Sequence, residues 1–197
     1  RTVVCGLVTI LSSTPRQGDD LRGSLATAKT AIAHRGPDGQ GTWVSDDGMA
    51  ALAHVRLSII DLDSGAQPMH SRCGRYTITY NGEVYNYLEL RAELEGKGHR
   101  FRTETDTEVI LAAYREWGER CVERFVGMWA FALWDLNDRS LFCSRDRFGI
   151  KPFHYIEEGG RFYFGSEYKA LRPAPVFSSS LNVDQALRGL QLGWNAY

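Results

Sequence analysis

The sequence predicts an α+β fold in which strands and helices form separate layers. Segments rich in β-branched and aromatic residues, which are typical of strands, lie toward both ends of the chain. Two or three segments between them carry apolar residues at helical spacing, and strands and helices do not strictly alternate. A parallel doubly wound sheet requires that alternation, so the order of elements favours layered sheets with helices packed against them. The length of 197 residues is typical of one domain.

The strands and helices are expected in a definite order. An apolar, β-branched run over residues 2–11 predicts a buried first strand. Asp19 and Asp20 then open an amphipathic helix, whose apolar stripe consists of Leu21, Leu25, Ala28 and Ile32. The turn-rich segment 34–39 ends this helix. Hairpins are expected over 42–53, 127–145 and 153–164, a strand over 76–80, and helices over 88–94 and 107–117.

From Arg172 onward the composition changes and predicts a linker. Pro173, Pro175 and the serine run 178–180 are typical of linker segments. We therefore expect one domain over residues 1–171 and, over residues 172–197, a linker toward a further domain.

Composition and charge exclude several classes of protein. Hydrophobic residues make up 43% of the chain and aromatic residues 12%, which excludes disorder as its main state. The formal net charge of −1 argues against a nucleic-acid partner, and no apolar run approaches the roughly 18 residues of a membrane span. The four cysteines form no C-x-x-C motif and no H-E-x-x-H occurs, so we expect no metal site. Reduced thiols and a cytoplasmic location are the expectation.

Polar residues suited to one chemistry recur where strands and helices begin or end. Cys5 lies in the first strand, Arg56 begins an apolar segment, the run 81–83 follows a strand, and Asp106 precedes a helix. A thiol can attack an acyl group, and an amide beside a backbone N–H can hold the oxyanion. A guanidinium can bind a carboxylate, and two carboxylates can hold an ammonium group. Together these groups would suit acyl transfer on an amino acid.

Each of these residues also has a purely structural interpretation. Free cysteine packs as a small hydrophobe, and Asn81-Gly82 is typical of a tight turn. Asp106 would cap the following helix, and Arg56 would be a surface cation. For each residue alone the structural interpretation is the stronger, and only the ordered combination favours a site.

Eight segments of the chain together resemble a known family. They are CG (5–6), HRGPD (34–38), AHVRLSIID (53–61), QPM (67–69), YNGEVYNY (80–87), TDTEVIL (105–111), GMWAFA (127–132) and RDRFGIKP (145–152). In these segments the chain resembles the class II glutamine amidotransferase domain that begins asparagine synthetases. The resemblance implies an N-terminal-nucleophile hydrolase fold, a four-layer αββα sandwich with two antiparallel sheets. It also implies hydrolysis of L-glutamine to L-glutamate and ammonia through a γ-glutamyl thioester.

The same resemblance implies roles for individual residues. Cys5 matches the nucleophile, and Asn81 and Gly82 match the oxyanion hole. The substrate-binding groups that match are Arg56 and the backbone around Ile59 and Ile60 for the α-carboxylate, with Glu83 and Asp106 for the α-amino group. Segment 35–38 matches part of the pocket wall, and segment 145–152 matches scaffold near a partner domain.

The position of Cys5 departs from the family's pattern. In the family this cysteine is the first residue of the mature chain, and its α-amine, with a pKa of roughly 7.7–8, is the general base. Here residues 1–4 precede Cys5, and an amide nitrogen cannot act as a base. Either these four residues are removed, or the start of the mature protein differs, or the site is inactive.

The resemblance implies partners as well. Ammonia would pass to a synthetase domain or subunit of the ATP-pyrophosphatase type, whose pyrophosphate-binding loop does not occur in this sequence. ATP and magnesium are expected only there, and no cofactor is expected for the glutaminase half. One alternative is a catalytically inactive structural or docking domain of an asparagine-synthetase-like enzyme. Another is an N-terminal-nucleophile amidohydrolase that acts on a different amide.

Overall fold

The computed structural model describes residues 5–15, 18–57, 65–175, 177, 180, 183–184 and 187–188. Within them the elements are, in chain order, β1 (Gly6–Ser12), α1 (Gly18–Ala31), η1 (Ala33–Arg35), β2 (Gly39–Val44), β3 (Ala50–Arg56), β4 (Met69–His70), β5 (Tyr76–Val84), α2 (Tyr87–Gly96), α3 (Asp106–Trp117), η2 (Gly118–Arg124), β6 (Gly127–Asp135), β7 (Ser140–Arg145), β8 (His154–Glu158), β9 (Arg161–Gly165) and η3 (Tyr168–Leu171). The η elements are short 3₁₀ helices. No helix in this part of the chain is long and apolar enough to cross a membrane.

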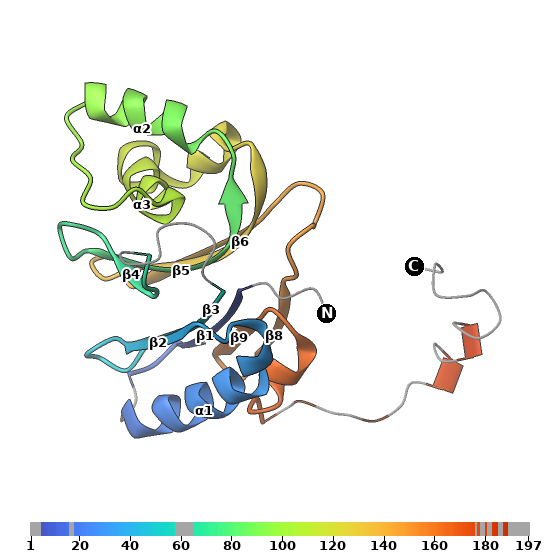
Figure 1. Cartoon of the computed structure of the whole chain (residues 1–197). Helices are drawn as coiled ribbons and strands as arrows, with labels where there is room; N and C mark the ends of the chain where they lie inside the picture. Colours follow the sequence, from blue (N-terminus) through green and yellow to red (C-terminus); the bar gives the residue numbers. More distant parts are fainter. Residues whose placement is uncertain are drawn as a thin grey trace.

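Two antiparallel sheets form the centre of the molecule (Figure 1). One has the strand order β2-β3-β1-β9-β8, and the other has the order β4-β5-β6-β7. The three expected hairpins are confirmed as the pairs β2–β3, β6–β7 and β8–β9. Each pair is joined by a short turn, which antiparallel strands allow and parallel strands do not.

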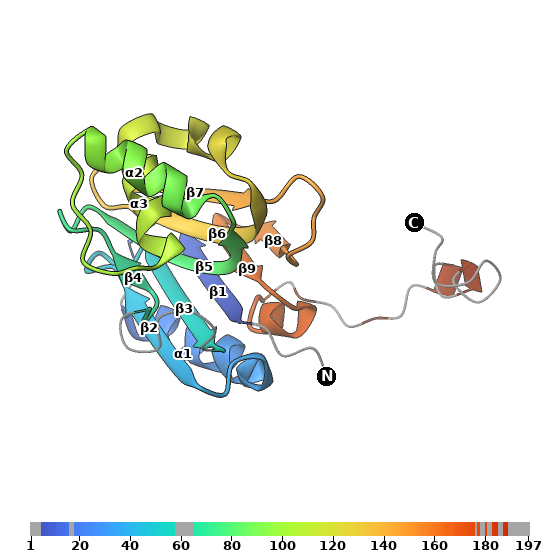
Figure 2. The same cartoon turned by 45° about the horizontal axis from the view of Figure 1, so that its top comes forward.

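Helices cover the outer face of each sheet, α1 on one side and α2 with α3 on the other (Figures 1 and 2). Side chains of a strand alternate between its two faces. In β1, Val8 and Ile10 therefore pack with the apolar stripe of α1, which includes Leu21 and Leu25, while Leu7 packs against the other sheet. The expected four-layer αββα sandwich is thus confirmed.

The inner faces of the sheets meet through buried apolar side chains, in which alanines pack against large residues. Ala130 and Ala132 of β6 pack with Leu7 and Phe164, and all four are fully buried. Trp134, at the far end of β6, packs with two residues of β3, Ala50 and Leu52. These contacts hold β1 and β3 directly against β5 and β6.

Two local predictions are corrected by the structure. The strand expected over 76–80 continues to Val84, so Asn81 and Gly82 lie inside β5 and the turn interpretation is wrong. The residue that caps α3 is Thr105, whose side chain accepts the Glu108 N–H at 3.3 Å, so the capping interpretation of Asp106 is wrong.

Two further expectations are refined. Arg56 is the last residue of β3 instead of the first of an apolar segment. Ile59 and Ile60 lie outside the described residues.

Candidate active site

A cleft of ≈200 Å³ opens where the start of β1 and the end of β3 meet β5. Its lining contains all the expected site residues that the structure describes, namely Cys5, Arg56, Asn81, Gly82, Glu83 and Asp106. These residues come from both sheets and from the first turn of α3. Folding therefore brings together side chains that are up to about a hundred positions apart in the sequence.

Cys5 lies immediately before β1, at the point where Gly6 pairs with Val55. Its Sγ accepts the Leu57 N–H at 3.3 Å and lies 3.4 Å from the Leu57 carbonyl oxygen. The Arg35 side chain donates from Nε to the Cys5 carbonyl oxygen at 3.1 Å. Burial raises the pKa of the Cys5 thiol above its ordinary value of 9.0, although Lys151 and Arg56 act in the opposite direction. The thiol is therefore protonated at neutral pH and needs a base before it can attack.

Asn81 projects from the inner face of β5 toward the other sheet. Thr79, two residues earlier on the same face, marks this direction because its hydroxyl donates to the Ala53 carbonyl oxygen of β3 at 3.1 Å. Asn81 is only 2% exposed, and its Nδ2 has no hydrogen-bond partner among the described residues. A buried donor without an acceptor costs about 1–3 kcal/mol, so this amide group is well placed for a ligand acceptor in the cleft.

The backbone N–H of Gly82 points to the open edge of β5. Along an antiparallel strand, successive N–H groups point to alternate sides. The Tyr80 N–H donates to Gln67 Oε1 at 2.6 Å and the Val84 N–H donates to Asp106 Oδ2 at 3.0 Å, both on the side away from β6. Gly82 lies between them in the alternation, so its N–H shares that side and faces the cleft.

Close packing explains why position 82 is glycine. A Cβ at this position would overlap the Met128 carbonyl oxygen and the Trp129 Cα of the neighbouring strand β6. Both atoms belong to the backbone and cannot move aside without disturbing the sheet. Glycine thus lets β5 approach β6 while its own N–H remains available at the edge.

Two carboxylates and two cations also line the cleft. Asp106 Oδ2 accepts the Tyr80 hydroxyl at 2.7 Å as well as the Val84 N–H. Burial raises the pKa of Asp106 above its usual range, and the nearby charge of Glu83 raises it further. A ligand cation between Glu83 and Asp106 would offset both effects. Arg56 and Lys151 supply the positive charge that a ligand carboxylate or a thiolate requires.

Sequence reasoning did not predict several residues that line the cleft, among them His54, Gln67 and Lys151. His54 Nε2 lies 3.0 Å from the Tyr80 carbonyl oxygen, and burial lowers its pKa to about 4, so the ring is neutral and donates this bond. Gln67 Oε1 accepts a hydrogen bond from the Tyr80 N–H. Together they fix the peptide groups next to Asn81. The signal that could have revealed His54 is a polar residue within the apolar strand 50–55.

Two assignments made from the resemblance need adjustment. No residue of segment 35–38 is among those that line the cleft, and Arg35 contacts the site by donating to the Cys5 carbonyl oxygen. Segment 145–152 is more than scaffold, because Lys151 projects into the same cleft as Cys5.

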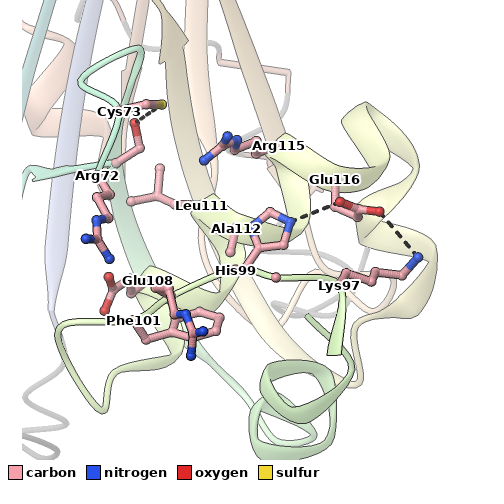
Figure 3. A pocket seen from close by; sticks show the side chains of 13 residues that line it. Arg72, Cys73, Lys97, His99, Phe101, Glu108, Leu111, Ala112, Arg115 and Glu116 are labelled. Carbon is pink, nitrogen blue, oxygen red and sulfur yellow. Dashed lines mark hydrogen bonds and ion pairs between the residues drawn. The ribbon is translucent and has the colours of Figure 1, made fainter. Parts of the chain in front are cut away.

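A second cavity, of ≈430 Å³, lies beside α3 and away from the cleft (Figure 3). Its rim carries the exposed residues Arg72, Cys73 and Arg115. Glu116 is paired with His99 at 2.9 Å and with Lys97 at 3.3 Å. Most ionisable groups of this cavity are exposed, and the buried Glu108 carboxylate already accepts the backbone N–H groups of Arg102 and Thr103. Among the described residues no cluster of three or more His, Cys, Asp or Glu side chains could hold a metal ion.

Comparisons with known proteins agree with this geometry. A family model described as "Glutamine amidotransferase domain" matches residues 4–194. "Asparagine synthetase [glutamine-hydrolyzing] 1" of Bacillus subtilis (strain 168) is 42% identical over 183 residues, which cover 92% of this chain and 28% of that protein. "Asparagine synthetase B [glutamine-hydrolyzing]" of Escherichia coli (strain K12) is 42% identical over 155 residues, covering 78% and 27% respectively.

A solved structure, glutamine phosphoribosylpyrophosphate (PRPP) amidotransferase from B. subtilis complexed with ADP and GMP, superposes with a TM-score of 0.69 at 20% identity. The match covers 85% of this chain and 43% of that one, and it supports the fold. The chain spans little more than a quarter of the length of the asparagine synthetases it matches.

Proposed function

The chain belongs to the glutamine amidotransferase domain family, and on that premise we propose that its cleft hydrolyses L-glutamine with Cys5 as the nucleophile. The observation that carries this proposal is Asn81 Nδ2, which is buried with no hydrogen-bond partner among the described residues, on a side chain that lines the same cleft as the Cys5 thiol. Donors held in advance at the position where negative charge develops are often the largest single contribution to acyl-transfer catalysis.

The reaction requires a base for the Cys5 proton. Because burial keeps the thiol protonated, the α-amine of an N-terminal Cys5, with a pKa of roughly 7.7–8, takes the proton. Sulfur attacks the side-chain amide carbon of glutamine, and the oxyanion is held by Asn81 Nδ2 and the Gly82 N–H. Collapse of this intermediate expels ammonia, which carries the transferred proton, and leaves a γ-glutamyl thioester. Water then hydrolyses the thioester to glutamate and restores the thiol.

The charged groups of the cleft suit a free amino acid. Arg56 would bind the α-carboxylate as a bidentate partner, together with the backbone around Ile59 and Ile60. Glu83 and Asp106 would hold the α-ammonium group, whose charge offsets the burial and the repulsion from Glu83 that raise the pKa of Asp106. This pairing of opposite charges distinguishes glutamine from amides that lack a zwitterionic end.

We also propose a partner and a setting for this reaction. The sequence relatives are named as asparagine synthetases, so the ammonia would pass to a synthetase domain that uses ATP and magnesium to make asparagine. Residues 1–171 would form the glutaminase domain, since the compact elements end with η3, and residues 172–197 would lead toward the synthetase domain. The location would be the cytoplasm.

The test is a glutaminase assay on protein whose N-terminus has been verified by intact mass. Protein that begins at Cys5 should release glutamate and ammonia from glutamine, whereas protein that retains residues 1–4 should be inactive. The matched control is Cys5→Ala, which should remove activity without lowering the melting temperature. High activity with residues 1–4 in place would refute the role of the α-amine. Inactivity of verified Cys5-terminal protein would favour a docking domain instead.

A further inference from the structure

The loop after β7 is built around one buried carboxylate. Asp146 is 4% exposed, and its two oxygens accept the N–H groups of Trp129, Phe148, Ile150 and Lys151 at 2.9–3.3 Å. Burial alone would raise the pKa of Asp146, but these backbone donors hold it below its usual value. The carboxylate therefore remains charged at neutral pH and fixes the backbone on both sides of the loop.

Arg145 fixes the same loop from outside. Its guanidinium donates to the Gly149 carbonyl oxygen at 2.6 Å and to the Lys151 carbonyl oxygen at 2.8 Å. Gly149 has a φ of 63°, and a Cβ there would press on the Arg145 guanidinium. The main chain of Lys151 is thus held through both its N–H and its carbonyl group. A lysine anchored in this way presents its side chain from a fixed position.

That side chain enters the cleft of Cys5. Lys151 lines the cleft and is half-buried. Burial lowers the pKa of Lys151, and a negative charge on Cys5 raises it again, so each charged form favours the other. The charge of Lys151 lowers the pKa of Cys5 more than the charge of Arg56 does.

We propose that the Lys151 ammonium group activates Cys5 by stabilising its thiolate in the cleft that both residues line. This inference rests on the proposed function, because an activated Cys5 matters only if it is the nucleophile. Its test does not require glutaminase activity. A fixed cation favours a nearby anion, so Lys151 promotes the loss of the Cys5 proton. Arg56 is then left for the substrate carboxylate.

Other charged groups also act on this pair and must be considered in any pH profile. Arg56 of β3 favours the Cys5 thiolate, and Arg35 of η1 disfavours the Lys151 cation. Glu83 of β5 and Asp146 favour the Lys151 cation. His54 is neutral near pH 7 because burial lowers its pKa to about 4.

The test is the pH dependence of Cys5 alkylation by iodoacetamide, which needs no glutamine and no glutaminase activity. It is performed on the full-length protein with a verified Cys5 N-terminus and in a Cys73→Ser background, because Cys73 is exposed and its hydrogen bond with Ser71 lowers its pKa. Lys151→Met should shift the midpoint of the alkylation profile upward by about one pH unit. Lys151→Arg should restore the profile because it keeps the cation.

Matched controls separate this effect from a loss of folding. Lys97→Met removes a lysine whose partner is Glu116, in the other cavity, and should leave the profile unchanged. Circular dichroism melts should be similar for all variants. An unchanged midpoint in folded Lys151→Met would overturn the inference, as would a rise in KM for glutamine with a normal profile, which would assign Lys151 to substrate binding. A shifted profile in protein that lacks glutaminase activity would uphold the inference while the proposed function failed.

Discussion

Asn81 and Gly82 are neighbours in β5 that contribute different atoms to the same cleft. Asn81 contributes its side-chain amide from the inner face of the sheet, and Gly82 contributes its backbone N–H from the strand edge. The two donors can converge because the short strand β4 pairs only with Thr77 and Ile78, which leaves the edge of β5 beyond Ile78 open. The chemistry of this part of the site therefore depends on where two N–H donors lie, one on a side chain and one on the backbone.

The Asn81 donor can be tested by removing its side chain. Asn81→Ala should lower kcat by about 10²–10³, as the loss of one oxyanion donor typically does. KM should change little, because the donor acts on charge that develops only in the transition state. Steady-state assays on Cys5-terminal protein measure both constants, and a thermal melt provides the control. A lower melting temperature with near-normal kcat would assign Asn81 a structural role instead.

Arg56 allows a test of substrate binding that leaves the chemistry intact. Arg56→Lys keeps the charge but loses the planar fork that binds a carboxylate with two parallel hydrogen bonds. KM for glutamine should rise at least about tenfold, equivalent to about 1.4 kcal/mol, with a smaller change in kcat. Substrate-saturation curves separate the two constants. If KM is unchanged, the substrate carboxylate is bound elsewhere and Arg56 serves the structure.

At the scale of elements, the loop between β7 and β8 shows how a segment without regular structure can be rigid. Four backbone N–H groups share the Asp146 carboxylate, and Arg145 binds two carbonyl groups of the same loop. Charge-assisted hydrogen bonds of this kind are stronger than neutral ones. The loop backbone is therefore held at several points by charged side chains.

The buried carboxylate makes this loop sensitive to pH. Asp146→Asn keeps one acceptor but places an amide against backbone donors, so it should lower the free energy of unfolding by about 1–3 kcal/mol near neutral pH. Because the folded state lowers the pKa of Asp146, its stabilising effect is present above the unfolded value of about 3.9 and is lost as the pH falls through the folded value.

Urea denaturation at several pH values measures the difference between wild type and this variant. The difference should be largest near neutral pH and should shrink below pH 4. A difference that stays constant down to strongly acid pH would mean that the charge of Asp146 does not stabilise the loop.

At the scale of the whole molecule, the site exists only because two sheets pack face to face. Cys5 and Arg56 belong to the end of one sheet, whereas Asn81, Gly82 and Glu83 belong to the other. Contacts between the inner faces, such as Trp134 with Leu52, hold the two halves of the site in place. Stability and activity can nevertheless be separated, because Trp134 lies four residues along β6 from the partner of Asn81.

Trp134→Ala should therefore destabilise the protein while leaving the chemistry of the folded fraction intact. Removing a fully buried tryptophan typically costs about 3–5 kcal/mol. At a low temperature where the variant remains folded, kcat and KM should match those of the wild type, and Trp134→Phe should lose less stability. If folded Trp134→Ala had a strongly reduced kcat, the packing between the sheets would also control the geometry of the cleft.

The sequence by itself determined the local elements and the list of site candidates. Hydrophobic periodicity and turn residues depend on neighbours along the chain, so the helix α1 and the hairpins β2–β3, β6–β7 and β8–β9 were predictable. The family's motifs identified Cys5 and Arg56 because those residue types lie in a characteristic order. At Asn81-Gly82 the local preference of these residue types predicted a turn. Pairing with β6 instead keeps both residues inside β5.

Only the tertiary structure decided which atoms face the cleft. Three features depend on contacts between residues that are far apart in the chain: Asn81 Nδ2, which has no partner in the part of the chain that the structure describes, the edge position of the Gly82 N–H and the entry of Lys151. Periodicity cannot encode such contacts, since it records which face of an element is apolar but not which element will pack against it. Burial between the two sheets, which raises the pKa of Cys5 and keeps His54 neutral, likewise arises only when the layers meet.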